Sequence, residues 1–470
     1  MIRPPLVIKR RSGRCSRFRC IVALIVVLAL FMPFAYISKI RRRRILESTS
    51  GNSESLPVQI NPQRLPEGKP VHFIYTIGCG GSSDTSWQLL QSTALDSSFL
   101  RVKQRGKITR LVSGCVNDFK RQEYISRSVI PYLQTYFVQS ADQVDVTSKT
   151  RDTRTYVQAN RPTALQEYLR VMEAKGEDVT TVYIVLDPDF IFRKQYPEDA
   201  IEAVKDGTLV SHRYSLMDPA SFAYPACMEA FNATLICDRI QYTKSFRSYH
   251  AGVPYMLTRN DWLKLLSYWI PLIGPVLLRY PGIESDMISW AIAAALAGLK
   301  SDLRSNFMAT CMSSERSSVE VLNHQVFLHL CQSYYIPETR SGDQYKVNNV
   351  AELPHIVQRK SWLRDVDYVF VFNKHWLKAS NLLEDCAVPL LVLPPTVLPE
   401  PRVAQDSHFF WFQAILSEAL DAYNRAIVDY RENILKCPKQ SLGGDVKRGL
   451  ILHERISKRF GGGWNHAIDL

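Results

Sequence analysis

The sequence predicts an α/β protein whose β-sheet is mostly parallel and is covered by helices on both faces. Three runs rich in β-branched and aromatic residues, at 71–77, 107–114 and 180–190, are typical of buried strands. Segments with helical spacing of their apolar residues lie between the second run and the third. Strands and helices in this order are joined by right-handed crossovers, which make the strands parallel.

The elements follow one another in a simple order. Residues 39–70 become rich in Ser, Pro and Asn and predict a stem that precedes the first strand. Helical spacing predicts helices at 122–137 and 161–174. Asn160 and Pro162 are expected to form the cap and first turn of the second of these helices.

The second half of the chain is mostly helical in its pattern. Apolar spacing predicts helices at 260–273, 285–299 and 408–431. The expected organisation is a main domain at 71–345, a C-terminal helical extension packed on it at 346–435, and a flexible tail at 436–470.

The positive charge of the chain is concentrated at its N-terminus. The net charge is +13, but residues 1–44 contain twelve Lys and Arg residues and no acidic residue. The other 426 residues are therefore almost neutral, with a net charge of +1. Nothing in them indicates binding to a phosphate backbone, so no nucleic acid is expected as a partner.

An uncharged apolar segment at 20–38 predicts a membrane anchor. Its nineteen residues are about the minimum that spans a bilayer core, and four arginines follow closely. A cleaved signal peptide is the alternative, although the apolar run is long and no small-residue cleavage site precedes the arginines. Seven basic residues lie before the segment and five after it, which favours a cytoplasmic tail at 1–19 and a lumenal body. The expected location is a Golgi or endoplasmic reticulum membrane, with a single pass.

The cysteines and one sequon agree with a lumenal body. Eight cysteines follow the apolar segment, and no C-x-x-C pair occurs among them. An even number is compatible with disulfides, whose pairing the sequence leaves open. Asn232, in the sequence Asn-Ala-Thr, is a predicted glycosylation site.

Two acidic residues end the third predicted strand. Asp187 and Asp189 flank Pro188, which keeps this short stretch extended. A period of two along an extended chain directs both carboxylates to the same side. Ligands of open α/β sheets bind at the carboxyl ends of strands. The pair therefore indicates a Mg²⁺ or Mn²⁺ site, whereas an ordinary strand end with solvated acids is the alternative.

Other nucleotide-binding and hydrolytic motifs are absent from the sequence. There is no P-loop and no G-x-S-x-G, and Ser83 stands where G-x-G-x-x-G would need its last glycine. The Asp187–Asp189 pair, the glycine-rich segment at 78–81 and the anchor with its stem together have the layout of a type II glycosyltransferase of the GT-A (Rossmann-like) fold.

Four segments carry a more specific resemblance. They are YTIGCGGSSDTSWQ (75–88), RLVSG (110–114), NRPTALQEYL (160–169) and VYIVLDPDFIFRK (182–194). In order and spacing they resemble the hydroxyproline O-arabinosyltransferases and peptidyl serine α-galactosyltransferases of plants and algae. The resemblance extends more weakly to about residue 340. Thr163 and Phe190 depart from the residues that this family usually has at those places.

This resemblance implies roles for the residues that match. Asp189 and His329 would bind Mn²⁺ or Mg²⁺, with His324 as a nearby rival, and Asp187 would hold the metal or the ribose of a uridine diphosphate sugar. The residues implied in binding the nucleotide sugar are Gly78, Gly80, Asn160, Arg161 and Asp187.

Glu284 is the residue expected to face the sugar or the acceptor, although Asp286 opens the same predicted helix. The resemblance implies retention of anomeric configuration, by front-face displacement or through a nucleophilic carboxylate. Glu284 and Asp189 are thus the expected catalytic residues.

The sequence therefore predicts a membrane-anchored, metal-dependent glycosyltransferase. Its donor would be a nucleotide sugar, and its acceptor a hydroxyproline or serine of a secretory-pathway protein. A lumenal binding or scaffold protein that keeps the fold without turnover is the main alternative. A metal-dependent phosphoesterase would need more clustered His and Asp ligands than the sequence offers.

Overall fold

The computed structural model describes residues 68–79, 86–115, 117–146, 153–214, 218–310, 319–330, 333–337, 368–374, 382–388, 390–391 and 407–437. The predicted tail at 1–19, the anchor at 20–38, nearly all of the stem and almost all of the C-terminal tail lie outside these residues. No helix in the described part of the chain is long and apolar enough to cross a membrane.

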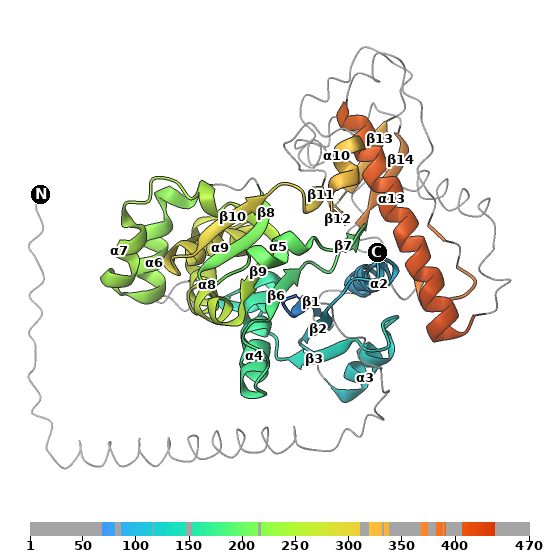
Figure 1. The fold of residues 1–470 in the computed structure, drawn as a ribbon, viewed down its shortest axis with the longest axis horizontal. Coiled ribbons are helices and arrows are strands. Elements are labelled where there is room, and N and C mark those ends of the chain that lie inside the picture. The colour runs from blue at the N-terminus through green and yellow to red at the C-terminus, as the bar shows by residue number, and fades with distance from the viewer. Residues whose placement is uncertain are drawn as a thin grey trace, which may run out of the picture. The chain divides into compact units, whose positions relative to one another are not determined.

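The main sheet has seven strands, and six of them run parallel (Figure 1). In spatial order the strands are β10 (Lys300–Arg304), β8 (Thr208–Arg213), β9 (Ala251–Thr258), β6 (Val182–Leu186), β1 (Val71–Gly78), β2 (Lys107–Ser113) and β3 (Gln134–Val138). Only β9 is antiparallel to its neighbours, β6 and β8. The prediction of an α/β fold with a mostly parallel sheet is confirmed.

The centre of the sheet is buried on both faces. Every residue of β6 and of β9 is buried, in continuous runs without polar alternation. Such runs are typical of strands that helices cover on both sides. Successive side chains point to opposite faces, and the ring of His72 lies against Tyr168 while that of Phe73 lies against Phe99. Helix α4 (Asn160–Ala174) thus covers one face of β1, and α2 (Ser86–Arg101) covers the other.

The remaining helices surround this core. They are α3 (Asp118–Ser126), α5 (Glu198–Ala203), α6 (Ala223–Phe231), α7 (Thr234–Gln241), α8 (Arg259–Arg279), α9 (Ser285–Leu296), α10 (Val319–His324) and α13 (Ser407–Tyr430). Helix α8 packs against α4 and α9, and α13 packs against α2 (Figure 1). The helices predicted at 161–174, 260–273, 285–299 and 408–431 correspond to α4, α8, α9 and α13.

Three smaller sheets complete the described fold. Strands β11 (Met308–Thr310), β12 (Phe327–His329) and β7 (Phe190–Phe192) form the first, in which β7 and β12 are antiparallel. The other two are the antiparallel pairs β13 (Ser333–Pro337) with β14 (Tyr368–Asn373), and β4 (Gln143–Asp145) with β5 (Thr153–Thr155). Strand β14 lies in the region for which the sequence predicts only helix.

The helix predicted at 122–137 is wrong in its second half. Helix α3 ends at Ser126, and residues 134–138 form strand β3 at the edge of the sheet. Pro131 stops a helix because its ring removes a backbone donor and clashes with the preceding turn. The following residues, Thr135 to Val138, are β-branched or aromatic and fit a strand.

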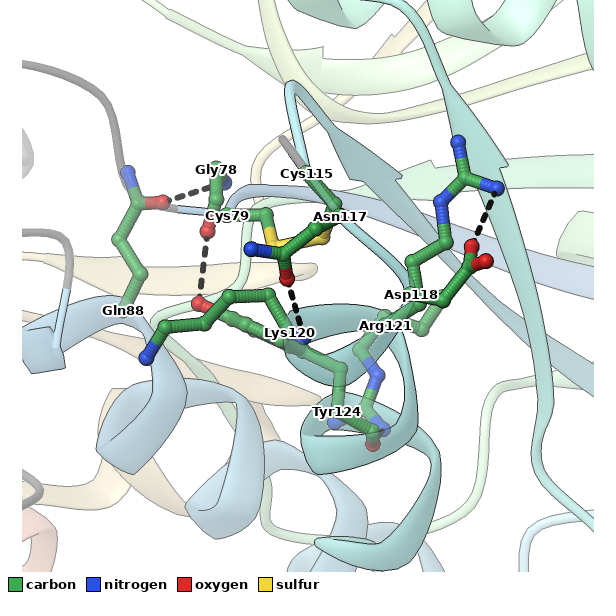
Figure 2. The surroundings of a disulfide bond; sticks show 10 residues. Gly78, Cys79, Gln88, Cys115, Asn117, Asp118, Lys120, Arg121 and Tyr124 are labelled. Atoms are coloured by element: carbon green, nitrogen blue, oxygen red, sulfur yellow. Dashed lines mark hydrogen bonds and ion pairs between the residues drawn. A yellow bond between two sulfur atoms is a disulfide. The ribbon is translucent and has the colours of Figure 1, made fainter.

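Three disulfides cross-link the described chain, namely Cys79–Cys115, Cys227–Cys237 and Cys386–Cys437. The first joins the segments that follow β1 and β2 (Figure 2). Disulfides in this number are typical of proteins in oxidising compartments, which agrees with the predicted entry into the secretory pathway.

Candidate functional site

The site lies where the connections of the sheet change direction. From β1 the chain proceeds to β2 and β3 on one side, and then returns to β6 on the other side of β1. The carboxyl ends of β1 and β6 thus lie next to each other at the switch point where ligands of open α/β sheets bind. Asp187 and Asp189 follow directly after β6.

Asp187, Asp189 and His329 form a cluster at this edge. One ligand atom of each lies within 4.8 Å of those of the other two. The approach of His329 has a simple cause, because His329 is the direct partner of Phe190 in the antiparallel pairing of β12 with β7. The predicted proximity of His329 to both acids is therefore confirmed. His324, the rival, is exposed on α10 and is not part of the cluster.

The donor atoms of this cluster fit a hard divalent cation. Two carboxylates and one imidazole nitrogen are ligands that Mn²⁺ accepts, and carboxylates also suit Mg²⁺. The Nε2 atom of His329 faces Asp189, at 3.5 Å from Oδ2. The other ring nitrogen, Nδ1, is buried and has no hydrogen-bond partner among the described residues. Nε2 is therefore the nitrogen that is placed to act as a ligand.

Asp189 is the most enclosed member of the cluster, with a side chain that is 7% exposed. Its Oδ2 atom accepts a hydrogen bond from Lys374 Nζ at 2.6 Å. Burial alone would raise the pKa of Asp189, but the charges and hydrogen bonds of Lys374 and His329 outweigh burial and hold the pKa well below its usual range. Asp189 is therefore a carboxylate at any physiological pH.

Asp187 is held by Arg161, which lies in the first turn of α4. The guanidinium pairs with Asp187 and also lies 3.5 Å from Oδ2 of Asp286. Burial would lower the pKa of Arg161, but the two carboxylates outweigh burial and raise it. Arg161 is thus a permanent positive charge between two acids, Asp187 after β6 and Asp286 in α9.

Asp286 rather than Glu284 is connected to the cluster. Asp286 is buried at the start of α9, and its backbone N–H donates to the Tyr156 hydroxyl at 2.9 Å. Burial, as the largest effect, raises the pKa of the Asp286 carboxyl to about 6. Glu284 is half-buried and accepts a hydrogen bond from Tyr280 at 3.4 Å. Both acids are candidates in the sequence, but only the fold shows that Arg161 contacts Asp286 as well as Asp187.

The residues expected near the nucleotide have structural partners. The N–H of Gly78 donates to Gln88 Oε1 at 2.7 Å, and its carbonyl accepts from the Tyr124 hydroxyl at 3.0 Å (Figure 2). Gly80 lies outside the described residues. Asn160 does not cap α4 as expected, because α4 begins one residue earlier with Ala159 in the cap position. The Oδ1 atom of Asn160 instead accepts a hydrogen bond from the N–H of Ala141 at 2.6 Å, which fixes the segment after β3.

Lys374 is the site residue that the sequence does not reveal. It follows β14, and its Nζ also donates to the carbonyl of Leu330 at 3.1 Å, directly after His329. Nothing near Lys374 in the sequence signals this role. Its position depends on the pairing of β14 with β13, which is a contact between distant segments.

Tyr214 borders the same region. Burial, as the main cause, and the charges of Glu284, Asp187 and Asp189 raise its pKa to about 12. The ring lies against the backbone at Gly252, where an added Cβ would stand 3.1 Å from Cδ2. The Tyr214 ring can pack this closely because Gly252 has no side chain.

Asn232 is exposed directly after α6 and has a left-handed backbone conformation, with φ at 47°. An exposed position suits the predicted glycosylation, which stays a prediction.

No protein-family model and no curated protein matches the chain. Among solved structures it is similar to the apo form of the bifunctional glycosyltransferase WbbM, at 8% identity and a TM-score of 0.32, with 56% of this chain and 45% of that chain covered. It is similar to mouse xyloside xylosyltransferase 1 at 10% identity and a TM-score of 0.33, covering 55% and 97%. It is also similar to an active-site mutant of LgtC at 10% identity and a TM-score of 0.32, covering 60% and 95%. The chain thus spans less than half of the WbbM chain. All three TM-scores are low, so the function proposed below rests on the site itself.

Proposed function

We propose that the protein is a metal-dependent glycosyltransferase of the GT-A type, which transfers a sugar from a nucleoside diphosphate sugar to a hydroxyl group. The observation that carries this proposal is the cluster of Asp187, Asp189 and His329 at the switch point of a mostly parallel sheet. A hard cation held there would lie at the edge where ligands of such sheets bind.

Different residues of the site would have different roles in binding the metal. Asp187, Asp189 and His329 Nε2 would hold Mn²⁺ or Mg²⁺, which when bound stabilises negative charge on a departing diphosphate. Arg161 fixes the Asp187 carboxylate, so that the acid does not need to be ordered when the metal binds. The low pKa of Asp189 keeps it ionised, as a metal-binding carboxylate must be.

The acceptor side of the site is proposed from the acids at α9. Glu284 would face the sugar or the acceptor, while Asp286 is connected to Arg161. With its pKa near 6, Asp286 is poised to hold or release a proton near neutral pH. The family resemblance supports uridine diphosphate as the nucleotide, retention of configuration, and a hydroxyproline or serine acceptor. Gly78, Gly80, Asn160 and Arg161 remain proposed contributors to the nucleotide-sugar site.

The proposed location is the lumen of the Golgi or endoplasmic reticulum, with the body tethered to the membrane through residues 20–38. Three disulfides support an oxidising compartment. The proposed acceptor is accordingly a protein of the secretory pathway.

A non-catalytic binding protein is the second candidate, and one observation favours it. Both acids of the pair already have a basic partner, Arg161 for Asp187 and Lys374 for Asp189. A scaffold could retain such ion pairs without a metal.

Turnover of donors distinguishes the two functions. The purified full-length chain in detergent, with Mn²⁺ and a panel of nucleotide sugars, is assayed for release of free nucleoside diphosphate. We expect slow, Mn²⁺-dependent release from one donor, which Asp189→Asn abolishes. Asp178→Asn changes an exposed acid that precedes the amino end of β6, whereas the cluster follows the carboxyl end, and should leave the rate unchanged. Absence of both turnover and Mn²⁺-dependent nucleotide binding would support the scaffold.

A further inference from the structure

Lys374 lies beside the position that a cation bound by Asp189 and His329 would occupy. Its Nζ lies 2.6 Å from Asp189 Oδ2, and the same oxygen is the one that His329 Nε2 faces at 3.5 Å. The side chain is only 12% exposed, so water screens its charge weakly. A protonated amine has no lone pair for a metal. A metal ligated by Asp189 and His329 would therefore lie beside the ammonium group and be repelled by it.

The second hydrogen bond of Lys374 shows where the amine can remain. The carbonyl of Leu330 accepts from Nζ at 3.1 Å and does not belong to the acid cluster. Lysine has three N–H donors on a flexible stem. Lys374 can therefore withdraw from Asp189, keep its bond to Leu330, and present free donors at the edge of the site.

The charges at the site indicate what those donors would meet. Asp187, Asp189 and Asp286 face two basic side chains, Arg161 and Lys374. A divalent cation would turn this small negative excess into a positive one. A diphosphate, which carries about two negative charges when esterified at both ends, returns the site to its small negative excess. It also accepts the hydrogen bonds of a released ammonium group.

We propose that Lys374 couples metal binding to diphosphate binding. In the free protein it competes with the metal for Asp189, and in the loaded protein it donates to the donor's diphosphate. The inference rests on the proposed function and deepens it. The metal alone would thus bind weakly. Diphosphate would increase the affinity for the metal in two ways, by contacting the metal directly and by drawing Lys374 away from Asp189. Linkage demands that the metal strengthens diphosphate binding by the same factor.

The test is a thermodynamic cycle on the full-length chain, with Mn²⁺ and uridine diphosphate as probes. Mn²⁺ affinity is measured by electron paramagnetic resonance with and without the nucleotide, for the wild type and for Lys374→Met. Removing the competing charge should tighten Mn²⁺ binding without nucleotide by about tenfold, and the coupling factor between Mn²⁺ and nucleotide should fall by about tenfold, within the usual range of such couplings. Lys374→Arg, which keeps the charge, should retain most of the coupling.

Two further variants serve as controls. Lys374→Gln keeps a hydrogen-bond donor without the charge and should reproduce the effect of Lys374→Met. Lys107→Met removes a lysine that lies 2.8 Å from Glu177, away from the cluster, and should change neither quantity.

Unchanged or weaker Mn²⁺ binding in both uncharged variants would overturn the proposal. So would failure of both to fold while Lys374→Arg folds, because Lys374 would then be a structural cation. These measurements need no sugar donor. If no donor is turned over but the cycle behaves as described, the proposed transferase fails while the coupling stands. If donors are turned over but the coupling is unaffected by Lys374, only the present inference fails.

Discussion

At the scale of single residues, the site is built from acids whose charges are balanced by particular basic groups. Arg161 is the clearest case, because one guanidinium contacts both Asp187 and Asp286. It joins the end of β6 to the start of α9. The acids of the candidate site and the packing of these two elements therefore depend on the same side chain.

Removing Arg161 should destabilise the protein in a pH-dependent manner. Arg161→Met leaves the buried Asp286 and the partly buried Asp187 without their basic partner, and breaking a buried pair costs about 3–5 kcal/mol. The Asp286 pKa is already raised to about 6, so this acid is mostly protonated at pH 5 and ionised at pH 8. Because the folded-state pKa is raised from 3.8 to about 6, this acid costs the wild type stability as pH rises from about 4 to about 6. Arg161 lowers this pKa, so without Arg161 the loss continues to higher pH.

We therefore expect a larger loss at pH 8 than at pH 5, measured by urea denaturation. Equal losses at both pH values would show that Arg161 does not act through Asp286. Arg121→Met, which removes an exposed pair with Asp118, serves as the control and should cost less than about 1 kcal/mol.

A second buried acid, away from the site, gives another prediction. Asp96 on α2 is fully buried and accepts a hydrogen bond from the hydroxyl of Tyr75 on β1 at 2.8 Å. Burial raises its pKa to about 7, although Arg110 and Tyr75 act in the opposite direction. The Asp96 carboxyl is thus protonated at pH 5 in the folded protein and ionised above pH 8.

Tyr75→Phe should cost more stability at pH 8 than at pH 5. A hydrogen bond to a charged group contributes about 1.5–3 kcal/mol, whereas one between neutral groups contributes about 0.5–1.5 kcal/mol. The measurement is the midpoint of denaturation at both pH values. A loss that does not grow with pH would contradict the ionisation of Asp96 in this range.

At the scale of elements, close backbone approach limits what can be changed. Helix α8 passes strand β4 at Gly274, where an added Cβ would overlap the carbonyl oxygen of Asp145 and stand 3.3 Å from the Cα of Val146. Because both neighbours are backbone atoms, the two elements would have to move apart.

Gly274→Ala should therefore destabilise the protein by about 1–3 kcal/mol, even though alanine is the better helix former. Ser267→Ala, on the exposed side of α8, should stay within about 0.5 kcal/mol of the wild type. Thermal denaturation of the two variants compares them directly. A Gly274→Ala protein as stable as the wild type would mean that α8 and β4 do not approach so closely.

The elements also show how far sequence reasoning reaches. Strands β1, β2 and β6 and helices α4, α8, α9 and α13 are recognisable because their apolar patterns are long and regular. The second half of the segment 122–137 is misassigned because its apolar spacing outweighs the effect of Pro131 in the prediction. Asn160 resembles a helix cap in sequence, but its side chain is used by a distant segment.

At the scale of the whole molecule, the site draws on residues that lie far apart in the sequence. Asp187 and Asp189 are predictable because both follow one strand, and His329 only because of a family resemblance. The parts that sequence could not predict are Lys374 and the choice of Asp286 over Glu284 as the acid that contacts Arg161. Both depend on strand pairing and helix packing between distant segments, which a linear pattern does not contain.

The central claim is that Asp187, Asp189 and His329 form a metal centre. The most direct measurement is anomalous diffraction at the manganese edge, from crystals of the protein grown with Mn²⁺ and uridine diphosphate. We predict one anomalous peak within roughly 2.5 Å of oxygen atoms of the two aspartates and of His329 Nε2. Clear diffraction with no peak there, or with a peak at another site alone, would contradict the account.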